Sequence, residues 1–326
     1  MSYLEVAKVH PKLGNLLEKG AVFGAKAAEE FAVNHGVSVE DIINMRVDGS
    51  LMLGMNRHMS TVGALEANKQ IPNEVAFKRV DAGGVESEWI YIPDATEKKV
   101  FFHLFGGGYM MGTLDTRRWS PYLYSRETNM RCLNIGYRLA PEYPYPAALE
   151  DSISAYKWLL AQDIDPKNVI ICGESAGGGL TMATMLKLRD LGLPMPAAAV
   201  MQSPWVDLRG RGKSLKSFYK YEPELASGVK AMASLYAGNN SRKNPYISPV
   251  YAEFDGLPPL LIQAGGIEVL RDEAILLAER AKTSGVDVTL EVYEGMTHVF
   301  QGFADELEES MDAWKKIGSF VKKYIS

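Results

Sequence analysis

The sequence predicts an α/β protein whose mostly parallel central sheet, of about eight strands, is covered by helices on both faces. Apolar runs rich in β-branched residues alternate with stretches of helical periodicity from residue 75 onward. Such alternation is typical of βαβ units, which place parallel strands side by side. The run at 100–105 is almost wholly apolar, as expected of a strand buried on both faces. The 326 residues suffice for one such domain with a small accessory part.

The individual elements follow from these patterns in chain order. Residues 1–70 show apolar residues at helical spacing, clearest at 20–32, and 38–41 resembles a helix start with acids in the first turn. A glycine turn at 83–84 joins the first two expected strands. The expected strands are 75–80, 85–93, 100–105, 131–137, 168–172, 197–202, 259–264 and 288–293. The expected later helices are 147–160, 180–188, 272–284 and 306–324, with another around 229–236.

Composition and charge argue against several classes of protein. The net charge of −5 gives no reason to expect nucleic acid as a partner. The sequence starts without a basic segment followed by an apolar one, and no window of about 18 residues is continuously apolar. We therefore expect a cytoplasmic protein with no membrane span. Cys132 and Cys172 lie in apolar strands, which favours buried free thiols over a disulfide.

Residues 173–177 form a Gly-x-Ser-x-Gly pattern centred on Ser175. The pattern alone often marks only a turn. Here a β-branched run precedes it and a helical stretch follows it, which is typical of a sharp turn that lifts a nucleophilic serine above a sheet. Glycine is expected at 173 and 177 because a Cβ there would collide with the neighbouring strand or helix. The N-terminal end of the following helix would favour negative charge near the reacting carbonyl.

Three consecutive glycines, Gly106, Gly107 and Gly108, directly follow the expected strand at 100–105. Such a loop is costly to order, which indicates that backbone N–H groups must approach a ligand oxygen closely. A phosphate cradle is the competing interpretation. The Lys-Ser or Lys-Thr pair of a phosphate-binding P-loop is absent, which counts against it.

A serine hydroxyl needs a general base, and the sequence has five histidines. His10, His35 and His58 lie in the N-terminal helical region, and His103 lies inside a strand, where a structural role is expected. His298 follows the last expected strand in a glycine-containing loop, at the sheet edge where ligands bind in open α/β folds. We therefore expect His298 to be the base.

The third member of a catalytic triad is an acid that orients the histidine. The loop after the strand at 259–264 offers two candidates, Glu268 and Asp272. Glu268 lies nearer the strand end, whereas Asp272 falls in or just before the next helix. Position alone favours Glu268.

Several motifs together resemble the hormone-sensitive-lipase-like branch of the α/β-hydrolase esterases, from about residue 75 onward. The matching segments are 105–109 (FGGGY), 112–115 (GTLD), 137–142 (YRLAPE), 146–151 (PAALED), 173–178 (GESAGG) and 295–298 (GMTH). The resemblance implies hydrolysis of short- to medium-chain carboxylic esters without cofactor or metal. It also implies oxyanion-hole N–H groups from Gly107, Gly108 and Ala176.

Two positions depart from the family pattern. Phe105 stands where the family usually has a histidine before the glycines, and His103 comes two residues earlier. We therefore expect the glycine loop to be held by packing instead of a side-chain hydrogen bond. Glu268 stands where many members have aspartate, which some relatives tolerate.

The resemblance also implies a helical cap. We expect 1–70 to be an N-terminal cap segment, 71–326 the catalytic domain, and 207–246 a second cap insertion. Met45, Met52, Met55 and Met59 suit an adaptable apolar surface over a pocket, although permanent packing on the core is an alternative.

The leading hypothesis is thus a serine carboxylesterase acting on a small-molecule ester through an acyl-enzyme intermediate. The alternatives are a non-catalytic ligand-binding protein on the same fold and a hydrolase of an amide or a specialised ester. The strand at 288–293, as an edge strand, would allow a homodimer.

Overall fold

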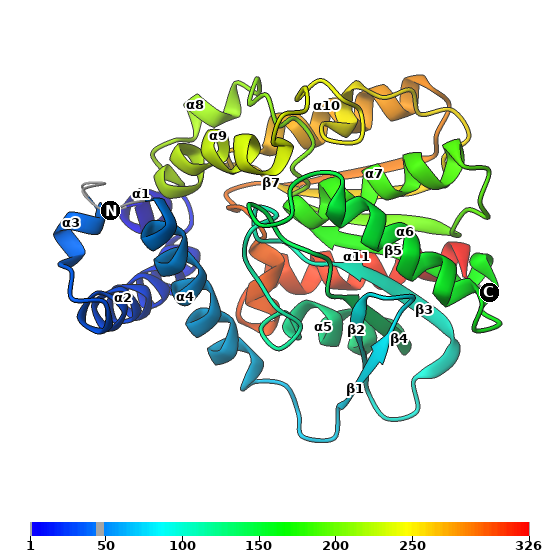
Figure 1. The fold of residues 1–326 in the computed structure, drawn as a ribbon, viewed down its shortest axis with the longest axis horizontal. Coiled ribbons are helices and arrows are strands. Elements are labelled where there is room, and N and C mark those ends of the chain that lie inside the picture. Colours follow the sequence, from blue (N-terminus) through cyan, green and yellow to red (C-terminus); the bar gives the residue numbers. More distant parts are fainter. Residues whose placement is uncertain (1, 44–48, 326) are drawn as a thin grey trace.

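The computed structural model describes residues 2–43 and 49–325, and these residues form one eight-stranded sheet flanked by helices (Figure 1). Met45, one of the methionines assigned to the cap surface, lies outside the described residues. The strands are β1 (Ala76–Asp81), β2 (Glu86–Tyr91), β3 (Thr96–Leu104), β4 (Met130–Ile135), β5 (Val169–Glu174), β6 (Ala198–Gln202), β7 (Leu260–Gly265) and β8 (Val288–Tyr293).

The sheet has the order β1-β2-β4-β3-β5-β6-β7-β8. The pairs β1–β2 and β2–β4 are antiparallel, and every other pair is parallel. The expected α/β class and strand number are confirmed. β3 begins four residues before the expected strand, because the charged residues 97–99 extend it across a register shift between Thr96 and Val100.

The helices that cover the sheet form two layers (Figure 1). On one face, α6 and α7 share a core with alternate strand residues such as Ile171; on the other, α5 and α11 pack on residues such as Cys172. Both cysteines are free and buried, as expected. The helices that flank the sheet are α5 (Trp119–Thr128), α6 (Ala147–Leu160), α7 (Ala176–Asp190), α10 (Arg271–Thr283) and α11 (Glu308–Tyr324). Short 3-10 turns are η1 (Pro166–Asn168), η2 (Pro249–Tyr251) and η3 (Phe300–Glu306).

The N-terminal region is helical, as expected, and lies beside the sheet (Figure 1). Ser38 precedes α3 and caps its first turn: its Oγ accepts the Asp41 N–H at 3.0 Å and donates to the Asp41 carboxylate. Val6 and Leu13 pack with Met296, which anchors this region beside the loop that carries His298. The helices are α1 (Ser2–Ala7), α2 (Pro11–Asn34), α3 (Val39–Ile43) and α4 (Gly49–Asn68).

The segment 207–246 holds two helices, α8 (Ser214–Ser217) and α9 (Pro223–Ala237), and α9 lies over the same end of the sheet as α4 (Figure 1). A helix was expected around 229–236, and α9 confirms it. Among the described residues, no helix combines the length and apolar character needed to cross a bilayer.

Candidate active site

Ser175 occupies a strained turn between β5 and α7. Its φ of 55° and ψ of −122° lie outside the regions that non-glycine residues usually adopt. A Cβ on Gly177 would lie 1.8 Å from the Leu104 carbonyl oxygen, and one on Gly173 would lie 2.4 Å from the same atom. Both glycines are therefore required by close backbone approach, as expected, and the turn exposes the serine Oγ at the end of β5.

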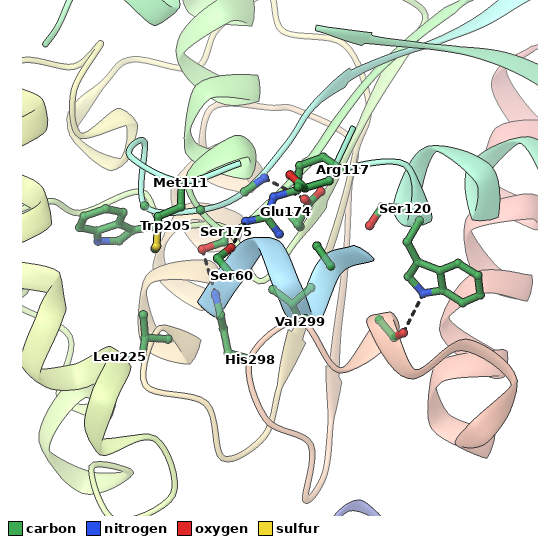
Figure 2. A pocket seen from close by; sticks show the side chains of 18 of the residues that line it. Ser60, Met111, Arg117, Ser120, Glu174, Ser175, Trp205, Leu225, His298 and Val299 are labelled. Carbon is green, nitrogen blue, oxygen red and sulfur yellow. Dashed lines mark hydrogen bonds between the residues drawn. The ribbon is translucent and has the colours of Figure 1, made fainter. Parts of the chain in front are cut away.

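His298 is brought to Ser175 from the loop after β8. Its Nε2 lies 2.9 Å from the Ser175 Oγ, so the hydroxyl can donate to a neutral imidazole (Figure 2). Burial alone would lower the pKa of His298. The neighbouring carboxylates of Glu268, Glu222 and Glu174 outweigh that effect and hold the pKa above its ordinary value.

Glu268 is fully buried behind the imidazole, and its Oε2 lies 3.7 Å from the Nδ1 of His298. That oxygen accepts the Ser203 hydroxyl at 2.5 Å and the Gly265 N–H at 3.1 Å. Glu268 Oε1 and His298 Nδ1 have no hydrogen-bond partner among the described residues. The two residues thus offer an unpartnered carboxylate oxygen and an unpartnered ring nitrogen, which are a matched acceptor and donor.

Asp272, the other candidate acid, lies in the first turn of α10. Its Oδ2 accepts the Ser214 N–H at 2.9 Å, and its Oδ1 pairs with Arg271 at 3.0 Å. The contact with Ser214 ties α10 to the segment 207–246, and Arg271 is a neighbour within α10, so Asp272 has structural partners of its own.

The loop of Gly106, Gly107 and Gly108 borders the same site. The φ angles of 132° at Gly107 and 62° at Gly108 favour glycine, and a Cβ on Gly108 would lie 2.4 Å from the sulfur of Met232. Within the described residues, the N–H groups of Gly107, Gly108 and Ala176 donate no hydrogen bond. They remain free for a ligand oxygen.

The loop is held by a buried side-chain network, so the expectation of packing alone is wrong. Glu174 Oε1 accepts the Gly106 N–H at 2.8 Å, and Glu174 Oε2 lies 2.9 Å from His103 Nε2. His103 Nδ1 lies 2.9 Å from the side-chain oxygen of Asn134. Phe105 instead stacks on Tyr137, with ring centroids 4.4 Å apart. The carboxylate of Glu174, backed by His103, thus supplies the hydrogen bond that Phe105 cannot make.

A cavity of about 510 Å³ opens above Ser175. Helix α4 contributes Met59 and Ser60 to its wall, and α9 contributes Leu225 and Met232, so segments far apart in sequence enclose it (Figure 2). The wall is mainly apolar. Arg117 also reaches the cavity, where its Nη2 donates to the Ser60 Oγ at 2.9 Å.

Comparison with known proteins identifies the family. The family model of the alpha/beta hydrolase fold matches residues 100–302. An acetyl-hydrolase of Streptomyces hygroscopicus is 36% identical over 244 residues, which are 74% of this chain and 81% of that protein. A crystal structure of an esterase from the bacterial hormone-sensitive lipase family is 41% identical, with a TM-score of 0.80 over 84% of this chain and 92% of that one.

The chain belongs to the α/β-hydrolase family. Within it, the chain is an esterase of the bacterial hormone-sensitive lipase group, a carboxylic ester hydrolase. A further structure, of the esterase EstE5 soaked with p-nitrophenyl butyrate, is 39% identical, with a TM-score of 0.79 over 83% of this chain and 91% of that one.

Sequence reasoning about this esterase did not find Glu174, Ser203 or Glu222. Glu174 occupies a variable position of the Gly-x-Ser-x-Gly pattern. Only its acidic side chain could have indicated a role in the site. Ser203 and Glu222 lie far in the sequence from the site residues that they contact, Glu268 and His298. Among the described residues, no group of three His, Cys, Asp or Glu side chains is arranged to hold a metal ion.

Proposed function

We propose that this esterase hydrolyses short- to medium-chain carboxylic esters through an acyl-enzyme intermediate, with Ser175 as nucleophile, His298 as general base and Glu268 as the acid that orients His298. The distance of 2.9 Å between Ser175 Oγ and His298 Nε2 carries the proposal. At this distance the hydroxyl proton can pass directly to the imidazole, which supports the proposed roles.

In the first step, Ser175 Oγ attacks the ester carbonyl carbon while His298 Nε2 takes the hydroxyl proton. Glu268 stabilises the imidazolium, for which its Oε2, at 3.7 Å from Nδ1, needs only a small shift. His298 then returns the proton to the departing alcohol. In the second step, His298 activates water, which attacks the acyl-enzyme and releases the acid.

The negative oxygen that forms in each step would be stabilised by the N–H groups of Gly107, Gly108 and Ala176. Each such donor typically contributes about 2.7–4 kcal/mol to transition-state stabilisation. Because these N–H groups have no partner among the described residues, no existing hydrogen bond must break first. The reaction draws on no cofactor or metal ion.

We further propose that 1–70 and 207–246 act as a cap on the catalytic domain, 71–326. Their helices α4 and α9 wall the cavity over Ser175. Its volume of about 510 Å³ suits a short or medium acyl chain. The relative EstE5, soaked with p-nitrophenyl butyrate, supports that substrate range.

A series of p-nitrophenyl esters from acetate to longer chains tests the substrate range. We expect kcat/KM to be highest for acetate to hexanoate and Ser175→Ala to lower it by about 10⁴-fold or more. Equal hydrolysis by the variant, or a preference for long chains, would contradict the proposal.

A homodimer is a separate proposal. β8 lies at the edge of the sheet, and Val292 on it is 42% exposed. An unpaired edge is a template for strand pairing, so we propose that two copies join through β8. Light scattering after gel filtration should give twice the mass of the monomer. Val292→Lys should lower the measured mass. A wild-type protein that is monomeric at all concentrations would exclude the pairing.

A further inference from the structure

Glu222 joins the two loops that carry Glu268 and His298. It immediately precedes α9 in the segment 207–246. Its Oε1 accepts the backbone N–H of His298, and its Oε2 accepts the backbone N–H of Val269 at 2.8 Å. Because Val269 directly follows Glu268, a single carboxylate contacts both the base residue and the neighbour of the acid.

The two loops are irregular backbone after β7 and β8, so their spacing depends on specific contacts between them. Ser203 provides one link, since its Oγ accepts the Val299 N–H at 3.0 Å and donates to Glu268. The Ile267 N–H provides another, to the Met296 carbonyl at 3.0 Å. Glu222 reaches both loops from a different part of the chain.

The charge of Glu222 also acts on His298. Burial and the nearby Glu268 raise the pKa of Glu222 to about 7, against the opposing effects of His298 and the two N–H donors. The carboxylates that act on the imidazole are Glu268, Glu222 and Glu174. An ionised Glu222 therefore favours the imidazolium form of His298.

We propose that Glu222 is a positioning residue that fixes the spacing of the Glu268 and His298 loops. This inference rests on the proposed roles of Ser175, Glu268 and His298. Leu225 and Val229, on the helix that Glu222 begins, line the cavity, whereas Glu222 itself does not. Its effect should therefore fall on kcat and not on substrate affinity.

The contact pattern requires a carboxylate. Two N–H donors face two oxygens, and glutamine offers only one oxygen, so its amide NH₂ would face one of the donors. Glu222→Gln keeps the shape but loses one hydrogen bond to a charged acceptor. We expect kcat to fall about 10-fold, a typical effect for one such bond. The links through Ser203 and Ile267 keep the loss from being complete.

The experiment compares the full-length wild type with Glu222→Gln, Glu222→Asp and the control Glu224→Gln, which removes an exposed charge from the same first turn of α9. Hydrolysis of p-nitrophenyl butyrate is followed from pH 5 to 9. Rates are normalised to active sites titrated with an organophosphate, so partly folded preparations still report on the folded enzyme.

We expect Glu222→Gln to lower kcat with KM unchanged and to move the acidic limb of the kcat/KM profile to lower pH, because His298 loses a stabilising negative charge. Glu222→Asp, shorter by one methylene, should lower kcat but leave the limb in place. Glu224→Gln should match the wild type.

An unchanged kcat, or an unmoved acidic limb in Glu222→Gln, would overturn the inference while leaving the proposed triad intact. A Ser175→Ala variant with full activity would instead overturn the proposed function itself.

Discussion

Glu174 Oε2 lies 2.9 Å from His103 Nε2, and both side chains are buried directly behind the glycine loop. Burial would raise the pKa of Glu174, but His103, the Gly106 N–H and Arg117 together lower it, so the carboxylate stays ionised near neutral pH. The charged oxygen that accepts the Gly106 N–H thus anchors the loop just before the proposed oxyanion donors.

Loss of this anchor should slow the reaction. Glu174→Ala removes the acceptor of the Gly106 N–H, and a hydrogen bond to a charged group is worth about 1.5–3 kcal/mol. We therefore expect kcat for p-nitrophenyl butyrate to fall by about 10- to 100-fold. Glu174→Gln, which retains one acceptor, should lose less. Equal rates in the wild type and Glu174→Ala would show that the loop holds its shape unaided.

The acidic limb of the pH profile should report the raised pKa of His298. The base must be neutral to accept the Ser175 proton, and a raised pKa keeps it protonated to a higher pH. Activity should therefore fall, as the pH is lowered, with a midpoint above 6.5, the ordinary value for histidine. The measurement is kcat/KM against pH at constant ionic strength. A midpoint at or below 6.5 would mean that the surrounding carboxylates do not act on His298 as described.

Arg57 should hold α4 on the catalytic domain. Its Nε donates to the Met110 carbonyl at 2.8 Å, its Nη2 to the Ala140 carbonyl at 3.1 Å, and its guanidinium pairs with Glu142 at 2.7 Å. The half-exposed ion pair adds about 1 kcal/mol at most. We expect Arg57→Met to speed proteolytic removal of the N-terminal helices, with Lys69→Met, on an exposed ion pair, as the control.

The same pair should weaken in acid. Arg57 lowers the pKa of Glu142 to about 2, so the stabilisation is complete above the ordinary value of 4.5 and is lost as the pH falls toward 2. The difference in protease resistance between Arg57→Met and the wild type should therefore shrink as the pH falls toward 2, and the two carbonyl contacts account for the part that persists. A difference that does not shrink would show that the pair with Glu142 adds nothing.

Two glycine substitutions should have opposite effects on stability. Gly177→Ala would place its Cβ 1.8 Å from the Leu104 carbonyl oxygen, so the elbow must distort and the free energy of unfolding should fall by several kcal/mol. Gly20→Ala has nothing within 4 Å of its Cβ and lies in the interior of α2, so it should raise that free energy by about 1 kcal/mol. Urea unfolding of both variants checks the pair, and a stable Gly177→Ala protein would refute the close approach.

The parts of the fold that sequence reasoning found are those coded by local patterns. The strands are short apolar runs, and Ser175 and His298 sit at recognisable turns after strands. Helix α5 was not anticipated, because all of Pro121–Ser125 are buried and the helix shows no one-sided apolar stripe. A helix enclosed on several sides lacks the periodicity that reveals an amphipathic one.

The missed site contacts depend on tertiary structure. Glu174 and Gly106 are 68 residues apart, and Glu222 and His298 are 76 apart. The strand order β3-β5-β6-β7 brings the loops after these strands to one end of the sheet. No local pattern in the sequence shows which carboxylate accepts which N–H there. The histidine missing before the glycines was visible, but its replacement by a carboxylate from the next strand was not.

The most direct test of the proposed mechanism is the site and rate of labelling by an organophosphate, measured by mass spectrometry of the digested protein. We predict one label per chain, on Ser175, formed much more slowly in His298→Ala while Glu224→Gln labels at the wild-type rate. Label on another residue, or equal labelling rates with and without His298, would contradict the proposed pairing of nucleophile and base.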